Sequence, residues 1–540
     1  MERHFKQLNQ NMKLLSFISL TFFFFTGVVN AQNSKVGTTL KFDEVITSIE
    51  RMYVDEVDAV ALTNTAIVAL LEKLDPHSTF ISKEEVNGAN ERINGNFVGI
   101  GIRFQILKDT LMVVATISGG PSEKVGLLAG DKIVTIADSN VAGNGLRNSG
   151  VRKRLLGDKG TKVSIQIKRK NVPKLLDFTI TRDVIPVHSV DAAYMITDKT
   201  GYIKMNTFSR NSLVEVQDGI QKLKKLGMEN LIFDLQGNGG GLLYTAKYLA
   251  DEFLTKDKLV VYSKGRVQPR IDLKTERKGL WEEGRLIVLT DETSASASEI
   301  LSGAIQDWDR GLVVGRRTFG KGLVQRPIDL SDGSQIRLTI ARYYTPSGRF
   351  IQKPYDDVEA YHNDLIDRYT HGEYMNQDSI KMPDSLMHKT LIKERTVFGG
   401  GGIMPDYFVP LDTTGISDYF TKLVRGGHLN AFTLTYTNKN RKAMQERYPE
   451  FADYKKKFKV DQSIINELVA YAQREDSTLV FDEEGYNESE FLLKLRIKAI
   501  FAQNLWGFKE FYEVYNESNE ILQRAVEIIE SKEYSKAGLD

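Results

Sequence analysis

The stretch from Leu231 to Leu243, LIFDLQGNGGGLL, decides the fold of this chain. Its first five residues have the pattern of a buried strand, and a helical stretch follows the glycines. Glycines between a strand and a helix gather bare backbone N–H groups at a helix N-terminus, where an anion or a developing oxyanion is stabilised. The dinucleotide fingerprint G-x-G-x-x-G fails, because Leu242 stands at its last position. A phosphate cradle, an oxyanion hole and a structural turn remain open.

Strand-like and helical stretches alternate around this segment, from residue 201 to residue 410. Such alternation predicts an α/β core that contains parallel strands. Residues 97–182 consist instead of short β-like runs separated by glycines, which predicts a compact β-rich module. Residues 41–84 and the chain after residue 411 are helix-patterned. We therefore predict an α/β multidomain protein.

The composition excludes several classes of protein. With 540 residues, 41% of them apolar, the chain can bury several cores, so disorder and coiled coil do not describe it. The 72 basic and 71 acidic residues leave a net charge of +1, which argues against a nucleic-acid partner. Cysteine is absent and the seven histidines are scattered. We therefore expect no metal site and no cofactor.

The first 31 residues have the plan of a secretory signal peptide. Arg3, Lys6 and Lys13 precede a 16-residue apolar run over 14–29, and small residues precede a cleavage site after Ala31. A membrane-spanning helix needs about 20 apolar residues. We therefore expect a cleaved signal and a periplasmic or extracellular protein, which would be membrane-associated if the segment were retained.

Residues 315–321, GRRTFGK, match the G-x-x-x-x-G-K pattern of a nucleotide-binding loop. Gly322 stands where that loop needs the hydroxyl that binds Mg²⁺. The next residues, LVQRPIDL, are β-like and contain Pro327, so they do not open a helix. We therefore expect no nucleotide here, and Lys321 needs another role.

Serines alternate with small residues in SASASE, residues 294–299, after the strand-like LIVLT. A hydroxyl at a strand-to-helix turn lies at the positive end of a helix, where an alkoxide is stabilised. An ordinary helix N-cap is the alternative. There is no G-x-S-x-G elbow, so an α/β-hydrolase triad is not indicated. A serine–lysine pair is a simpler arrangement, because burial lowers the pKa of a lysine and its neutral amine can take the hydroxyl proton.

Three segments in this order resemble those of the carboxyl-terminal processing peptidases, also called tail-specific proteases: FDLQGNGGGLL, TSASASEIL and VVGRRTFGKGLVQ. The resemblance extends over residues 40–410. It implies that Ser296 is the nucleophile and Lys321 the general base. Gln325, expected on the same strand face as Lys321, would hold the lysine amine.

The same resemblance assigns the oxyanion hole to the N–H groups of Gly240 and Ala297, which would donate to the charge on the scissile carbonyl. One position departs from the family pattern. Gln236 stands where the family has an arginine, so another group must provide the stabilisation that the guanidinium provides in the family.

The β-rich module resembles a PDZ domain, through FVGIGI at 97–102 and GGPSEKVGLLAGDKIVTI at 119–136. The implied peptide-binding residues are Gly99, Ile100, Gly101 and Ile102. The loop amides would bind a C-terminal carboxylate, and the next strand would pair with the peptide. Ile100 and Ile102, expected beside the groove, favour an apolar terminal residue. A structural β-domain without a ligand is the alternative.

The resemblance implies a serine endopeptidase that recognises protein C-termini and cleaves peptide bonds through an acyl-enzyme. The alternative is a non-catalytic PDZ scaffold or chaperone on a degenerate protease core. The expected partners are proteins or peptides with apolar C-termini, while a homo-oligomer or a regulatory adaptor stays open. The expected segments are a signal peptide (1–31), an N-terminal helical segment (32–84), a PDZ domain (85–185), a protease core (186–410) and a C-terminal helical domain (411–540).

Overall fold

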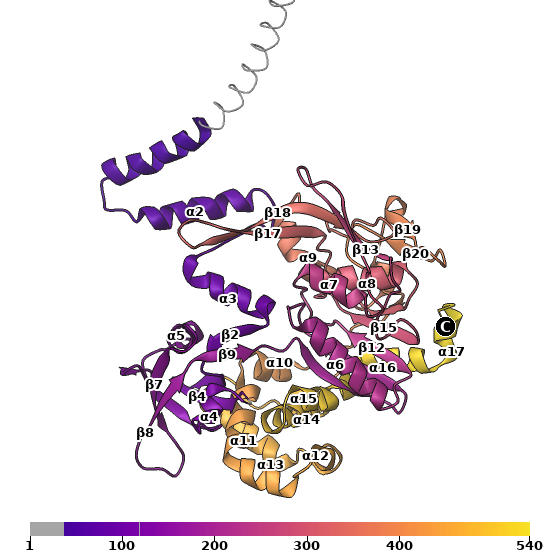
Figure 1. The fold of residues 1–540 in the computed structure, drawn as a ribbon. Coiled ribbons are helices and arrows are strands. Elements are labelled where there is room, and N and C mark those ends of the chain that lie inside the picture. Colours follow the sequence, from indigo (N-terminus) through magenta and orange to yellow (C-terminus); the bar gives the residue numbers. More distant parts are fainter. Residues whose placement is uncertain (1–36, 118, 540) are drawn as a thin grey trace, which may run out of the picture. The chain divides into compact units, whose positions relative to one another are not determined.

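Figure 1 shows the computed structural model of the chain, which describes residues 37–117 and 119–539. The chain divides into a smaller unit, up to residue 82 with 327–338, and a larger unit formed by the rest. Within the described ranges, no helix combines the length and apolar character that a membrane span needs. The predicted signal peptide lies outside the described residues.

The smaller unit contains the helices predicted near the N-terminus. One helix occupies 37–52, and α2 (Ala59–Glu72) begins after Asp58, whose side chain caps it. β1 (Thr79–Ile81) then pairs antiparallel with residues 335–337. None of the predicted site residues belongs to this unit.

The larger unit begins with α3 (Lys83–Asn94) and the β-rich module. The module has one main antiparallel sheet in the order β3-β4-β5-β7-β8, with β6 paired to β5, so β3 is an edge strand. Alternate residues of β7 are buried, as expected for a sheet with one face on a core. Its elements are β2 (Asn96–Gly99), β3 (Ile102–Leu107), β4 (Thr110–Thr116), α4 (Pro121–Lys124), β5 (Lys132–Ile136), β6 (Ser139–Asn140), α5 (Asn148–Leu155), β7 (Lys162–Lys168), β8 (Leu176–Thr181) and β9 (Asp183–Pro186).

A six-stranded sheet forms the predicted α/β core, in the order β10-β11-β12-β15-β16-β21. β10 is antiparallel to β11, and the other neighbours are parallel. The strands are β10 (Val190–Met195), β11 (Thr200–Met205), β12 (Asn230–Asp234), β15 (Arg285–Thr290), β16 (Leu312–Gly315) and β21 (Tyr407–Phe408).

Helices cover both faces of this sheet. Leu231 and Phe233 pack with α6 (Ser212–Lys225), α7 (Leu243–Ala250) and α8 (Ala297–Asp307). Ile232 faces the other side and packs with α16 (Glu520–Glu530) and α17 (Lys532–Lys536). α16 lies against β12 and β15 (Figure 1). The end of the C-terminal helical region therefore supplies one layer of the core.

A second sheet in the larger unit pairs β13 with β14 and with the end of β18. β17 pairs with β18 and covers LVQRPID, so the β-structure expected after Lys321 is confirmed. The remaining elements of this region are β13 (Leu259–Lys264), β14 (Ile271–Lys274), β17 (Leu323–Asp329), β18 (Gln335–Tyr344), α9 (Val358–Thr370), η1 (Gln377–Ser379), η2 (Asp384–Leu386), β19 (Met387–Lys389) and β20 (Thr396–Phe398).

The chain after residue 417 is helical, which confirms the predicted fold class. Most of these helices share an aromatic-rich core that includes Tyr454, Phe501 and Tyr486. They are α10 (Asp418–Arg425), α11 (His428–Arg447), α12 (Phe451–Lys457), α13 (Gln462–Glu475), α14 (Glu483–Leu505), α15 (Phe508–Tyr515) and η3 (Asn516–Ser518).

Candidate active site

Three neighbouring parallel strands bring the three motifs to one edge of the core sheet. β12 pairs with β15, and β15 pairs with β16. Because the carboxyl ends of parallel strands lie at the same edge, the segments that follow these strands adjoin. They are the glycine loop (residues 235–241), the serine turn (291–296) and the lysine loop (316–322).

Ser296 lies immediately before α8, at its N-terminus, and is half-buried. Its backbone has φ 56° and ψ −112°. A residue with a Cβ pays roughly 1–3 kcal/mol for such a conformation, which persists only where surrounding contacts fix it. The turn is therefore held by its neighbours and directs Ser296 at the positive end of the helix.

The carboxylate of Glu299 ties the serine turn to the lysine loop. Oε2 accepts the N–H groups of Ser296 at 2.7 Å and Lys321 at 2.9 Å. Oε1 accepts the Thr318 hydroxyl at 2.6 Å and the Gly320 N–H at 2.7 Å. Complete burial raises the pKa of Glu299 to about 7, although all four donors favour the ionised form.

Tyr343, on β18, makes a second link between the same two segments. Its hydroxyl donates to the Ser296 carbonyl at 3.2 Å and also to the Lys321 carbonyl. Burial, with the nearby charge of Glu299, holds the pKa of Tyr343 far above its usual range, so it stays a donor. The backbones of Ser296 and Lys321 are therefore joined through two buried side chains.

The glycine loop lies directly against the serine turn at Gly240. A Cβ built on Gly240 would be 2.8 Å from the Ser296 Cβ and 2.9 Å from the Ala297 nitrogen, closer than real Cβ contacts. Its φ of +98° also favours glycine. Only a glycine lets this loop approach the serine so closely.

The two predicted oxyanion donors differ in this structure. The Ala297 N–H, the first of α8, has no acceptor among the described residues. The Gly240 N–H instead donates to the Asn238 side-chain oxygen at 2.9 Å. The prediction overlooked this, because an asparagine can hydrogen-bond the backbone two residues on and fold the loop itself. Gly240 can donate to a substrate only after this bond opens.

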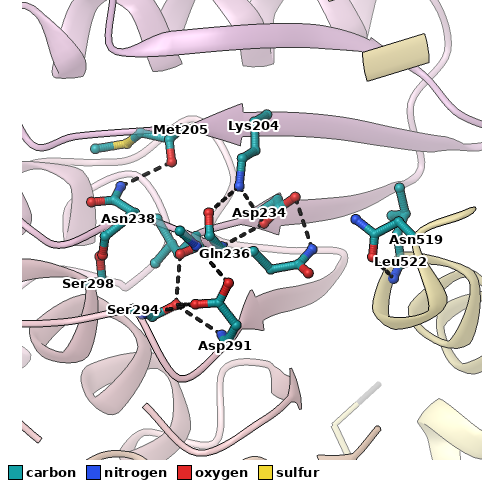
Figure 2. A network of polar contacts seen from close by, with 12 residues as sticks. Lys204, Met205, Asp234, Gln236, Asn238, Asp291, Ser294, Ser298, Asn519 and Leu522 are labelled. Carbon is teal, nitrogen blue, oxygen red and sulfur yellow. Dashed lines mark hydrogen bonds and ion pairs between the residues drawn. The ribbon is translucent and has the colours of Figure 1, made fainter. Parts of the chain in front are cut away.

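Hydrogen bonds fasten the glycine loop to the serine turn (Figure 2). The Asn238 carbonyl accepts the Ala295 N–H at 3.0 Å and the Ser298 hydroxyl at 2.8 Å. The Gly237 N–H donates to Asp291 at 2.8 Å. The two segments therefore form one preorganised unit.

Lys204 places a positive charge beside Gln236, which stands where the family pattern has an arginine. Its buried ammonium is 3.1 Å from Asp234 Oδ1 and also donates to the Gln236 carbonyl (Figure 2). The Gln236 N–H and side-chain amide donate to the same carboxylate, at 2.7 and 3.2 Å. Sequence reasoning missed Lys204, although a lone lysine in the strand-like GYIKMNTF was a signal.

The structure changes one prediction about the lysine loop. β17 begins at Leu323, so Lys321 precedes the strand and does not share a strand face with Gln325. The two glycines that flank Lys321 favour a turn there rather than extended pairing. The Gln325 amide donates to the Thr339 hydroxyl on β18 at 3.3 Å.

The carboxylate loop of the β-rich module has the expected backbone but one unexpected side chain. Gly101 has φ +73°, and Ile102 is half-buried at the start of β3. Ile100 is only 2% exposed and packs in the module core, so it does not line a groove as predicted. Its carbonyl accepts the N–H and hydroxyl of Ser122, at 3.0 and 2.6 Å, so the backbone at Ile100 is tied to the start of α4.

Comparison with known families matches three parts of the chain. Residues 199–359 match peptidase family S41, and residues 98–180 match the PDZ domain. Residues 419–507 match a family of unknown function, DUF8443.

Within the described ranges, no group of three or more acidic or histidine side chains is placed to hold a metal ion.

Named relatives agree with these matches. A carboxy-terminal-processing protease of Bartonella bacilliformis is 34% identical over 352 residues, which cover 63% of this chain and 80% of the relative. A probable CtpA-like serine protease of Staphylococcus aureus (strain N315) is 33% identical over 313 residues, 58% of this chain and 62% of the relative's length. A solved structure, the photosystem II D1 C-terminal processing protease, matches with a TM-score of 0.33 at 29% identity, over 59% of this chain and 91% of that chain.

Proposed function

Because the chain belongs to the carboxy-terminal-processing proteases of peptidase family S41, we propose that it is a serine endopeptidase that recognises protein C-termini through its PDZ domain. One observation carries the catalytic part of this proposal. Glu299 and Tyr343 join the backbones of Ser296 and Lys321, which supports one shared site for two residues 25 positions apart.

In the proposed reaction, the neutral amine of Lys321 takes the proton of the Ser296 hydroxyl, and the oxygen attacks the carbonyl carbon of the scissile bond. The C–N bond of the tetrahedral intermediate then breaks, and Lys321 gives the proton to the leaving amine. Lys321, neutral again, then takes a proton from water, whose oxygen attacks the carbonyl carbon of the acyl ester. The C–O bond to Ser296 breaks, and Lys321 returns the proton to the serine oxygen. Gln325 is proposed to orient the lysine amine.

The oxyanion of this intermediate is stabilised by hydrogen-bond donors that are aimed at the developing charge. The Ala297 N–H, at the positive end of α8, is proposed as the first donor. The second is the Gly240 N–H, which exchanges its hydrogen bond to the Asn238 side chain for one to the substrate carbonyl. The short approach of Gly240 to Ser296 supports this assignment.

Substrate recognition is proposed to use the amides of Gly99, Ile100, Gly101 and Ile102 for the terminal carboxylate. β3 follows this loop and has a free edge in its sheet, so an extended peptide can pair with it as a further strand. Ile102 beside this edge favours an apolar terminal residue. The substrates are therefore proteins or peptides with accessible apolar C-termini.

The test is cleavage of two fluorogenic peptides that end in the same apolar residue, one as a free carboxylate and one as an amide. We expect the carboxylate peptide to be cleaved and the amide to have a KM at least about tenfold higher, because the amide lacks the charge that the loop binds. Equal KM values would remove the PDZ domain from recognition. No cleavage of either peptide under any condition would contradict the catalytic part.

Export to the periplasm or the cell exterior is proposed from the sequence of the first 31 residues. N-terminal sequencing of the protein from its natural host is expected to find a chain that begins at residue 32. A mature protein that retains residues 14–29 would contradict cleavage and favour a membrane-associated form.

A further inference from the structure

An arginine of the PDZ domain, Arg103, lies near enough to an arginine of the C-terminal helices, Arg441, for its charge to lower the pKa of the second. The guanidinium carbon of Arg103, on β3, is 5.5 Å from the centroid of the Phe508 ring. Arg441, on α11, donates from Nη1 to the Asn504 carbonyl at 3.0 Å, while its Nε and Nη2 are buried without a hydrogen-bond partner. In the part of the chain that the structure describes, no acidic side chain stands against either arginine.

Two other cations of the PDZ domain are neutralised. Lys108, which follows β3, is 2.9 Å from Glu475, and Arg169 is 2.7 Å from Asp131. Burial lowers the pKa of Arg103, while burial and the charge of Arg103 together lower that of Arg441. Two partly buried positive charges without a counterion are costly. An anion bound beside Arg103 would relieve this cost.

Arg103 lies on the face of β3 that is turned away from the PDZ core. Ile102, Phe104 and Ile106 pack against that core. Because side chains alternate along a strand, Arg103 and Gln105 point to the opposite face. That face carries the Phe508 contact with the C-terminal helices.

The register of a bound peptide follows from the position of the carboxylate loop. The loop precedes β3, so a peptide whose carboxylate lies there runs antiparallel along the free edge of β3. When its last residue is opposite Ile102, its penultimate residue is opposite Arg103. Opposite residues of an antiparallel pair share a face of the sheet, so the penultimate side chain points toward Arg103.

We propose that Arg103 binds a glutamate or aspartate side chain at the penultimate position of the substrate, with Arg441 as a second positive charge behind it. The preferred substrates are then protein C-termini with an acidic penultimate and an apolar last residue. This inference rests on the proposed function, because it requires a peptide C-terminus on β3. It also gives the C-terminal helices a part in recognition.

The experiment measures binding to the full chain with Ser296→Ala, so that the peptides stay intact. Two fluorescent peptides differ only in glutamate or glutamine at the penultimate position, and a third is the glutamate peptide with an amidated C-terminus. We expect the Kd of the glutamate peptide to be about tenfold lower than that of the glutamine peptide, the effect of one partly exposed charged hydrogen bond. Adding Arg103→Gln should reduce this ratio to below about twofold. The control Lys108→Gln removes an equal charge that Glu475 already neutralises, and should leave the ratio unchanged.

The outcomes separate the two proposals. Equal affinity for glutamate and glutamine, with weaker binding of the amide, would overturn the role of Arg103 while the PDZ proposal stands. A glutamate preference that survives Arg103→Gln would overturn the assignment to this residue. Equal binding of the carboxylate and the amide would overturn both proposals. Thermal unfolding of each variant shows whether a lost preference comes from a lost fold.

Discussion

Ser296→Ala and Lys321→Met are each expected to lower kcat for peptide cleavage by at least about a thousandfold, as removal of a nucleophile or its base does in other serine proteases. Ser296→Ala removes the attacking oxygen. Lys321→Met keeps the length and apolar stem of the side chain but has no amine to accept the proton. Because the two groups act in one step, the double variant should be no slower than either single variant. The measurement is the rate at saturating peptide.

A matched control comes from Ser302 on α8, one helical turn beyond Ser298, whose carbonyl accepts the Ser302 hydroxyl at 2.8 Å. Ser302→Ala should retain the kcat of the parent protein. A serine-reactive probe should label residue 296 in the parent and far more slowly in Lys321→Met. Normal turnover in either Ser296→Ala or Lys321→Met, with the fold retained, would refute the dyad. An inactive parent protein that the probe does not label would favour the non-catalytic scaffold.

The sequence predicted the parts of the site that depend on local pattern. LIFDL and LIVLT have the composition of buried strands, and both are strands of the core sheet. The glycine, serine and lysine motifs, in that order, predicted the protein family. Their meeting at one sheet edge follows once β12, β15 and β16 are neighbours, since parallel strands end at the same edge.

Contacts between distant parts of the chain were not predictable in the same way. Nothing around Tyr343 indicates that its hydroxyl reaches the carbonyls of Ser296 and Lys321. Nothing in SASASE indicates that the Glu299 carboxylate accepts the Lys321 N–H, because that contact depends on how the lysine loop folds. Such pairings are set by tertiary packing, which local propensity does not encode.

The C-terminal region shows the same limit at the scale of elements. Its helical pattern predicted helices, yet the pattern cannot say what an apolar face packs against. Ile521, Leu522 and Ile528 of α16 pack on the core sheet. Arg103 and Phe508 lie beside each other although 405 positions separate them in the sequence. The site and its recognition surface therefore extend beyond the segments that carry the motifs.

Glu299→Gln is expected to lower kcat by at least about a hundredfold, the loss that a displacement of about 1 Å in a catalytic group can cause. Each oxygen of the carboxylate accepts two donors, and glutamine replaces one oxygen with a donating NH₂ group. Two of the four donors then face the NH₂ group of the glutamine. They are either the N–H groups of Ser296 and Lys321 or the Thr318 hydroxyl with the Gly320 N–H. Either change lets the lysine loop move relative to the serine. The measurement is kcat at saturating peptide.

A control separates this effect from a general loss of stability. Glu252 is also buried and accepts the Gln217 amide at 2.7 Å and the Leu280 N–H at 3.0 Å, so it touches neither the serine turn nor the lysine loop. Glu252→Gln should lower stability by about 1–3 kcal/mol, the cost of an unsatisfied buried group, with kcat retained. Unchanged kcat in Glu299→Gln would refute the coupling between the two segments.

The raised pKa of Glu299 also makes the stability difference between the parent protein and Glu299→Gln depend on pH. Its pKa of about 7 in the folded protein exceeds the ordinary value of 4.5, so between these pH values the folded state binds more protons than the unfolded state. The free energy of unfolding of the parent protein must therefore fall as pH rises through this window, by about 3 kcal/mol for this group. Glutamine does not titrate, and other groups cancel in the comparison. Denaturation midpoints at pH 5 and pH 8 measure the stability of the parent protein and of Glu299→Gln. The parent protein should be more stable than the variant by a smaller amount at pH 8 than at pH 5. An equal difference at the two pH values would mean that burial does not raise this pKa.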